Sequence, residues 1–226
     1  MDANIKKQVD LHFDALPKST KKALDFFAEQ EWLKHTHWYL AGGTALTLHE
    51  GLRKSVDLDF FTTDLEFKTD EIMQYFVNNP NWKTSFVEAG TIYGELFGAK
   101  VSFIAYPFFI PEQAMTSYGF VKILKPLDIA VMKIIVISQR GRKRDFFDLY
   151  WCAKNIESLS VILKKLKKQY PLVAHDYHHI LKSLVYFEDA QGDPEPEIYF
   201  KTTWRDVKGF FNSEVPKIMK EILEFD

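Results

Sequence analysis

The chain has very little cysteine and no long apolar segment. Its 226 residues include one cysteine, Cys152, which excludes an internal disulfide, and no Cys/His cluster has the spacing of a zinc site. The first residues contain no apolar stretch of signal-peptide length, and the longest apolar run, around residues 134–137, is too short to span a bilayer. We therefore expect a soluble cytoplasmic protein that makes no membrane contact.

A strong net charge is also absent. The chain has 29 Lys and Arg against 31 Asp and Glu, a formal charge of −2, which excludes a nucleic-acid binder whose whole surface is basic. The charge is nevertheless uneven, because residues 121–182 contain 13 basic and 5 acidic residues while the segments on both sides are acidic. This distribution suits a polyanionic substrate, so RNA is not excluded.

Aromatic residues are abundant, with 20 Phe, 10 Tyr and 5 Trp making up 15% of the chain. Most of them recur at helical or alternating spacing, so we expect them in the core. A hydrophobic content of 46% and a charged content of 27% are ordinary for a folded protein. The length is sufficient to bury a sizeable core.

Hydrophobic periodicity divides the chain into a mixed part and a helical part, with the boundary before Pro126. We expect an α+β fold in which residues 1–124 form an α/β domain and residues 125–226 form a helical domain. Ser19 or Thr20 is the expected N-cap of the first helix. Strands are predicted at 38–41, 56–61, 82–88, 91–96 and 100–106, and helices at 21–35, 44–51, 70–78, 127–138, 143–155, 158–169, 175–187 and 206–225.

Two aspartates lie on the second predicted strand. Side chains alternate along a strand, so Ser55, Asp57 and Asp59 share one face while the apolar residues between them face the core. Two neighbouring carboxylates repel each other unless a cation lies between them. Mg²⁺ prefers such oxygen ligands together with substrate phosphates. The alternative to a metal site is an exposed hairpin edge on which both carboxylates are solvated.

A glycine turn precedes this strand. Gly42 and Gly43 let the backbone approach a ligand closely, and Thr44 could help to cap the helix that follows. The first N–H groups of that helix would point at a phosphate. The glycine turn, the helix start and the Asp-x-Asp strand together predict a site for a nucleoside triphosphate and a metal.

These motifs resemble those of a known family. The run 42–46, Gly-Gly-Thr-Ala-Leu, followed by Arg-x-Ser-x-Asp-x-Asp-Phe at 53–60, resembles the AbiEii toxin branch of the polymerase-β-like nucleotidyltransferase superfamily. Segments 127–133 and 144–150 are similar to its lysine-bearing helix and its late aspartate motif. The resemblance covers roughly residues 36–151 and implies a nucleotidyltransferase-like mixed sheet flanked by helices, followed by a helical bundle that contributes Lys and Asp to the same cleft.

The resemblance also implies an activity and partners. Such an enzyme transfers a nucleoside monophosphate from an NTP to an acceptor, with Mg²⁺ or Mn²⁺ held by Asp57 and Asp59, and with Gly42, Gly43, Thr44 and Ser55 binding the nucleotide. Related toxins add nucleotides to tRNA acceptor ends, and other members modify protein hydroxyls. A cognate antitoxin is an implied partner.

The helical part provides three further candidate catalytic residues. Lys133 lies beside the apolar face of its predicted helix and could neutralise triphosphate charge, although most lysines are solvated on the surface. Asp145 and Asp148 share one helix face; they could orient Lys133, act as a base or position the nucleotide, or only complement the helix dipole. Arg140, Arg142, Lys143 and Arg144 are the expected RNA contacts, weaker candidates than the aspartates.

One position departs from the superfamily pattern. Many polymerase-β-like enzymes carry a third carboxylate on a later strand, where this chain has Ser102, a poor base and a weak Mg²⁺ ligand. Asp145 or Asp148 could replace that carboxylate, Glu95 could reach in, or one metal could suffice. A nucleotide-binding or regulatory protein that kept the fold and lost turnover is therefore the second hypothesis.

Overall fold

The computed structural model describes residues 10–223 and contains one mixed seven-stranded sheet of order β3-β4-β5-β2-β1-β7-β6. β1 is antiparallel to β2 and parallel to β7, and β2 is parallel to β5. This confirms the predicted α+β fold. The strands are β1 (Tyr39–Ala41), β2 (Leu58–Thr62), β3 (Trp82–Glu88), β4 (Thr91–Leu96), β5 (Ala99–Ala105), β6 (Thr116–Tyr118) and β7 (Val121–Ile123).

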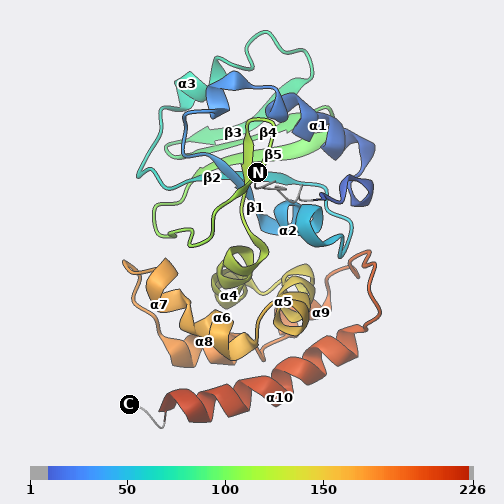
Figure 1. Cartoon of the computed structure of the whole chain (residues 1–226), viewed down its shortest axis with the longest axis vertical. Helices are drawn as coiled ribbons and strands as arrows, with labels where there is room; N and C mark the ends of the chain where they lie inside the picture. The colour runs from blue at the N-terminus through green and yellow to red at the C-terminus, as the bar shows by residue number, and fades with distance from the viewer. Residues whose placement is uncertain (1–9, 224–226) are drawn as a thin grey trace, which may run out of the picture.

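The helices lie around the sheet and below it (Figure 1). Two short 3-10 turns, at Phe13–Ala15 and Glu31–Leu33, flank the first α-helix. None of the helices within residues 10–223 combines the length and the apolar character needed to cross a membrane. The α-helices are α1 (Lys18–Ala28), α2 (Gly42–Glu50), α3 (Thr69–Met73), α4 (Pro126–Arg140), α5 (Lys143–Asn155), α6 (Leu159–Lys164), α7 (Leu166–Gln169), α8 (Tyr177–Ser183), α9 (Glu188–Gln191) and α10 (Trp204–Leu223).

Several predicted boundaries were wrong for local reasons. The first helix begins after Pro17, not at a serine or threonine cap, and Thr20 donates its hydroxyl to the carbonyl of Val56 instead. The helix predicted over 158–169 is broken into α6 and α7, with Ser158 capping α6. The short strands β6 and β7 were not predicted. The predicted closing helix corresponds to α10, and its last two predicted residues lie outside the described ones.

Aromatic side chains fill the core on one side of the sheet, as expected. Phe27 of α1, Phe60 of β2 and Phe103 of β5 are essentially unexposed, and the rings of Phe60 and Phe103 stack with centroids 5.2 Å apart. Asp59 alternates with Leu58 and Phe60 along β2, so it lies on the opposite side of the sheet.

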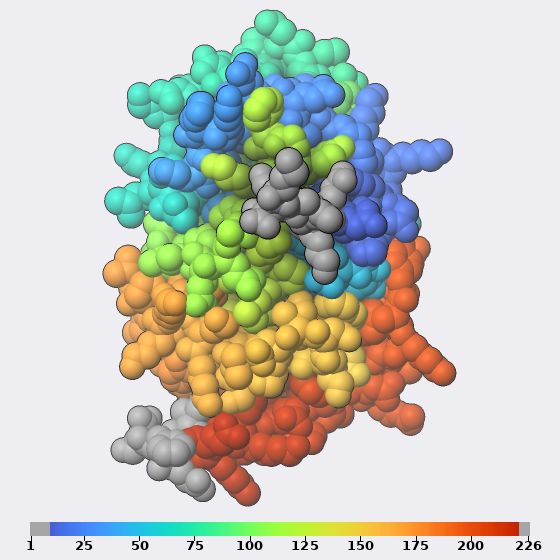
Figure 2. Space-filling model, viewed as in Figure 1, coloured from blue at the N-terminus to red at the C-terminus, as the bar shows by residue number. Residues whose placement is uncertain are grey.

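The helical part packs against the end of the sheet at which α2 lies. Figure 1 shows α1 beside the upper strands of the sheet and α4 to α10 below the sheet, with α10 along the lower edge. Figure 2 shows the two parts in close contact along the middle of the molecule. α4 packs on α2 and α5. This packing brings α4 and α5 to the residues that follow β1 and precede β2. The division into domains at residues 124 and 125 stays a prediction.

Candidate active site

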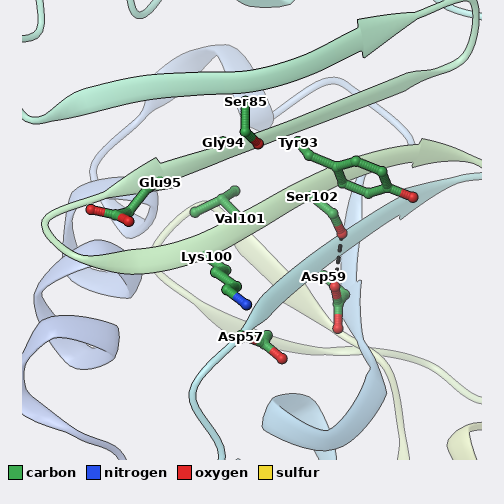
Figure 3. Close-up of a pocket in the computed structure, with 9 residues that line it drawn as sticks. All are labelled: Asp57, Asp59, Ser85, Tyr93, Gly94, Glu95, Lys100, Val101 and Ser102. Atoms are coloured by element: carbon green, nitrogen blue, oxygen red, sulfur yellow. Dashed lines mark hydrogen bonds between the residues drawn. The ribbon is translucent and has the colours of Figure 1, made fainter.

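Asp59 lies in the middle of the sheet, between two strands that present different groups to it. Leu58 and Phe60 are buried in the core, so Asp59 faces the other side, as the alternation predicted. Its register neighbours are Ala41 on β1 and Ser102 on β5. The hydroxyl of Ser102 donates a hydrogen bond of 2.8 Å to Oδ1 of Asp59 (Figure 3). One carboxylate oxygen is therefore fixed by the sheet itself.

Asp57 comes just before β2, because the strand begins at Leu58 and not at Val56 as predicted. Its side chain is 27% exposed, and its Oδ2 lies 3.6 Å from Nη1 of Arg144 on α5. Asp57 and Asp59 both line a cavity of about 580 Å³ between the sheet and the helices α4 and α5. The structure thus brings the two predicted metal ligands to one site.

The glycine turn directly adjoins Asp59. Gly42 has a φ of +70°, and a Cβ there would lie 3.1 Å from Oδ2 of Asp59. A Cβ on Gly43 would lie 2.1 Å from Nη2 of Arg53, which is too close for any side chain. The positive φ of Gly42 and the guanidinium of Arg53 beside Gly43 favour glycine at both positions, and both glycines line the cavity where α2 begins.

Thr44 does not cap α2, in contrast to the prediction. The helix begins two residues earlier, at Gly42, with Ala41 as its N-cap. The buried Thr44 hydroxyl donates to the carbonyl of Asp57, and its Oγ1 lies 2.9 Å from Oγ of Ser55. Thr44 thus ties the start of α2 to the segment before β2, while Ser55 lines the cavity.

A buried group of two cations and two carboxylates lies beneath the cavity. Nζ of Lys133 lies 2.5 Å from Oδ1 of Asp145 and 2.8 Å from Oδ2 of Asp148. Asp148 also accepts hydrogen bonds from Nε and Nη2 of Arg53, at 2.6 and 2.9 Å. Lys133, Asp145 and Arg53 line the cavity, whereas Asp148 is wholly buried behind them.

The charges in this group stabilise one another. Burial alone would raise the pKa of Asp148, but Arg53 and Lys133 outweigh it and lower the pKa to about 2. Burial would lower the pKa of Lys133, but Asp145 and Asp148 raise it above its usual value. Lys133 is therefore a charged ammonium at the cavity wall, and not an exposed surface lysine.

The charge of Asp59 has no comparable counterion. Burial raises the pKa of this carboxyl and the negative charge of Asp57 raises it further, against the hydrogen bond from Ser102 and the more distant charges of Lys133 and Arg144. Two carboxylates whose charges are only partly balanced, with oxygen ligands alone, form a donor set that suits a hard divalent cation. Asp57 and Asp59 are therefore the residues that could hold a metal.

The four basic residues at the junction of α4 and α5 separate into two pairs. Arg140 and Arg144 line the cavity. Arg142 forms an ion pair of 2.7 Å with Asp193 in the segment before α10, and the buried Lys143 donates to the backbone carbonyl of the same Asp193. The structure thus places only one pair at the cavity and uses the other to anchor a loop.

A comparison with known protein families shows which family this chain belongs to. Residues 28–81 and 93–224 match the family described as "Nucleotidyl transferase AbiEii toxin, Type IV TA system". The chain belongs to the AbiEii family. The resemblance expected from the glycine turn and the aspartate strand is thereby confirmed, as is the expectation of a nucleotidyltransferase.

Three individual proteins are similar to this chain. The uncharacterised protein aq_aa25 of Aquifex aeolicus (strain VF5) is 36% identical over 190 residues, which cover 83% of this chain and 88% of the relative. The crystal structure of a candidate nucleotidyltransferase from H. pylori shares the fold, with a TM-score of 0.52, 17% identity and coverage of 93% of this chain and 99% of that one. MenT4, the nucleotidyltransferase toxin Rv2826c of Mycobacterium tuberculosis H37Rv, matches with a TM-score of 0.46, 14% identity and 89% of both chains.

The third acidic position of this AbiEii family member is not filled by a nearby carboxylate. Glu95 on β4 lies on the same side of the sheet but points away from Asp57 and Asp59 (Figure 3). Asp145 lines the cavity from α5, and its Oδ2 has no hydrogen-bond partner. Within residues 10–223 no group of three His, Cys, Asp or Glu side chains is placed to hold a metal ion. Of the alternatives weighed for Ser102, the direction of its side chain argues against Glu95, while Asp145, Asp148 and a single metal stay predictions.

Arg53 and Tyr93 are among the cavity-lining residues that were not identified as site residues from the sequence. Arg53 stands two positions before Ser55, so the alternation that selected Ser55, Asp57 and Asp59 also points to it, yet it was noted only as part of a motif. Tyr93 on β4 lines the cavity because it is the register neighbour of Ser102. Only the strand pairing reveals that relationship.

Proposed function

We propose that this protein transfers a nucleoside monophosphate from an NTP to a hydroxyl of tRNA, with Mg²⁺ or Mn²⁺ at Asp57 and Asp59. One observation carries the proposal: the two carboxylates and the glycine turn at the start of α2 line one cavity together with Lys133, Arg140 and Arg144. A triphosphate needs both a metal-binding acidic pair and surrounding cations, and this cavity offers both.

The phosphates would lie against the start of α2. The N–H groups of its first residues, Gly43 among them, point away from the helix and suit an anion, and Ser55 adds a hydroxyl. A metal held by Asp57 and Asp59 would neutralise negative charge on the phosphate oxygens. Gly42 leaves the room that the substrate needs beside Asp59.

Lys133 would stabilise the charge of the triphosphate from the opposite wall. Its ammonium is held in place by Asp145 and Asp148, so no side-chain ordering is required when the substrate binds. Asp145 lines the cavity and pairs with Lys133 through Oδ1, so its role in this proposal is to orient that ammonium. Asp148, buried behind it, would position Lys133 and Arg53.

The acceptor, a cognate antitoxin partner and the cytoplasmic setting belong to the same proposal. Arg140 and Arg144 at the cavity, within the basic segment 121–182, support a polyanionic acceptor. The name of the matched family, a toxin of a type IV toxin–antitoxin system, supports an antitoxin partner.

The test is incubation of the pure protein with labelled NTPs, Mg²⁺ and total tRNA. We expect label on RNA with the wild type and none with Asp59→Ala, while NTP binding in the absence of metal is retained. Glu95→Ala is the matched control, because this carboxylate lies on the same side of the sheet but points away from the aspartates. Equal labelling by wild type and Asp59→Ala would contradict the proposal.

The second candidate is a nucleotide-binding protein that has lost turnover. The observation that favours it is Ser102, which donates to Asp59 and stands where the resemblance to polymerase-β-like enzymes implies a third carboxylate. Retained NTP binding by the wild type with no transfer to RNA or protein would support this candidate. In that case Ser102→Asp is the variant that should restore transfer.

A further inference from the structure

A row of four side chains crosses the sheet from the proposed metal ligand to its edge. In register, Asp59 of β2 neighbours Ser102 of β5, Ser102 neighbours Tyr93 of β4, and Tyr93 neighbours Phe86 of β3. Register neighbours point to the same side of a sheet, so the row starts at the carboxylate and ends on two aromatic rings. Figure 3 shows the Tyr93 ring beside the Ser102–Asp59 hydrogen bond.

These two aromatic rings stack on each other and, unlike the rings of the core, are exposed. Their centroids are 5.8 Å apart with an interplanar angle of 26°, and Phe86 and Tyr93 are 44% and 42% exposed. Their surroundings on this side are polar, since Ser85, Glu95 and Lys100 line the same hollow as Tyr93. A flat apolar surface with polar groups around it matches a nucleobase, which has an apolar face and polar edges.

The hairpin that carries these rings is anchored from behind. Gly94 has no side chain, and a Cβ there would lie 2.4 Å from the Trp82 ring. Trp82 can therefore pack under the hairpin, where it stacks on the buried Phe76 with centroids 4.1 Å apart. The aromatic pair is thus held on a rigid support, which lowers the entropy lost when a ligand stacks on it.

The in-line geometry of phosphoryl transfer indicates which substrate would bind at this surface. The phosphate-binding turn lies on the β1 side of Asp59, where Gly42 follows Ala41. In phosphoryl transfer the attacking and the leaving oxygen are roughly in line, on opposite sides of the phosphorus. With pyrophosphate leaving toward α2, the attacking hydroxyl must arrive from the other side of Asp59, which is the side of β5, β4 and β3.

We propose that Tyr93 and Phe86 form a stacking platform for an unpaired base at the single-stranded end of the acceptor RNA. This inference rests on the proposed function, and it adds where the acceptor binds and why an unpaired end is required. Bases are free to stack on protein side chains only where the RNA is single-stranded. Lys100, which lines the hollow between Tyr93 and Asp57, would contact a phosphate of the same strand.

The first test measures binding without turnover. A short single-stranded RNA with 2-aminopurine near its 3′ end is titrated with the protein at fixed salt and without NTP, and stacking is read as fluorescence quenching. We expect quenching with the wild type and Tyr93→Phe, and an affinity at least about tenfold weaker with Tyr93→Ala. Tyr186→Ala, which removes a ring that is 54% exposed on the helical part, is the matched control. Both tyrosines are exposed, so the alanine variants are expected to fold.

The second test separates this inference from the proposed function. In the transfer assay, Tyr93→Ala should raise the KM for RNA about tenfold and leave the KM for NTP unchanged. Transfer with an unchanged RNA KM would overturn the platform and leave the proposed function standing. If the protein transferred no nucleotide but still quenched the fluorescence in a way that depends on Tyr93, the stacking platform would stand and the proposed function would be overturned. If Tyr93→Ala lost affinity for NTP, the ring would belong to the donor nucleotide site. If Phe86→Ala abolished self-association and left RNA binding unchanged, this face would be a protein contact. Either result would overturn the inference.

Discussion

Asp148 of α5 accepts two parallel hydrogen bonds from the guanidinium of Arg53, at 2.6 and 2.9 Å, across 95 positions of sequence. Both side chains are almost entirely buried, and Lys133 lies 2.8 Å from the same carboxylate. The segment before β2 is thereby linked to the helices that supply Lys133 and Asp145. The alignment of the acidic and the basic walls of the cavity therefore depends on this pair.

Removing one partner of this pair should destabilise the whole protein. Asp148→Ala leaves Arg53 and Lys133 buried without their shared counterion, which typically costs about 3–5 kcal/mol. We expect the urea midpoint to fall accordingly, whether or not substrate is present. Glu197→Gln is the control, since it removes an exposed pair with Lys54 and should change the free energy of unfolding by less than about 1 kcal/mol. Equal midpoints for Asp148→Ala and Glu197→Gln would contradict a structural role for Asp148.

The two pairs of basic residues between α4 and α5 should respond differently to substitution. Arg144→Ala removes a cation that lines the cavity, so RNA affinity should decrease and the slope of log K against log salt should fall by about one. Arg142→Ala removes an equal charge only two residues away, but one that is paired with Asp193. We expect little change in RNA binding for Arg142→Ala. Salt titrations of tRNA binding distinguish the two variants, and equal slopes would show that the arginine at the cavity makes no phosphate contact.

The acidic half of the site could be predicted from the sequence because its geometry is local. Asp57 and Asp59 are two positions apart, so the period of an extended chain predicts them on one side, and both line the cavity although β2 begins only at Leu58. The glycine turn is equally local, although the packing of Gly43 against Arg53 is not. Motif order was sufficient to identify the family, and the match with the AbiEii family confirms it.

The remaining features depend on contacts between distant segments. Tyr93 reaches the cavity only because β4 pairs with β5 and β5 pairs with β2. Lys143 is one position from Arg144, yet a loop 50 residues away binds it and removes it from the cavity surface. Thr44 was predicted as a cap from its neighbours in sequence, whereas its hydroxyl is bound by the segment before β2. Strand register and loop docking cannot be read from periodicity.

Ser102 should act on the reaction through Asp59. Its hydroxyl fixes one carboxylate oxygen of Asp59, so Ser102→Ala frees that oxygen and removes a hydrogen bond to a charged group. We expect transfer to fall about tenfold and the Mg²⁺ concentration at half-maximal rate to rise, with NTP binding in the absence of metal unchanged. Ser85→Ala, which removes a hydroxyl from the same hollow, is the control. If the transfer rate of Ser102→Ala stayed equally low at every Mg²⁺ concentration, Ser102 would not act by positioning Asp59.

His49 should make the protein less stable as the pH falls below neutrality. It lies in the last turn of α2, where burial lowers its pKa from 6.5 to about 4 and the charge of Lys125 adds to the effect. The folded state therefore binds a proton less readily than the unfolded state, so the stabilisation is complete above pH 6.5, decreases as the pH falls from 6.5 to about 4, and is constant below that.

The size of this effect follows from the shift in pKa. A depression from 6.5 to about 4 corresponds to a loss of about 3 kcal/mol over that interval. Urea unfolding of wild type and His49→Gln across the interval isolates this contribution, because every other titrating group is common to both proteins. We expect the difference in free energy of unfolding to change by that amount in favour of His49→Gln at the acidic end. The exposed His35→Gln should instead parallel the wild type. If His49→Gln also paralleled the wild type throughout, the acid sensitivity would have to arise from other groups, and the partly buried imidazole at the end of α2 would contribute nothing to it.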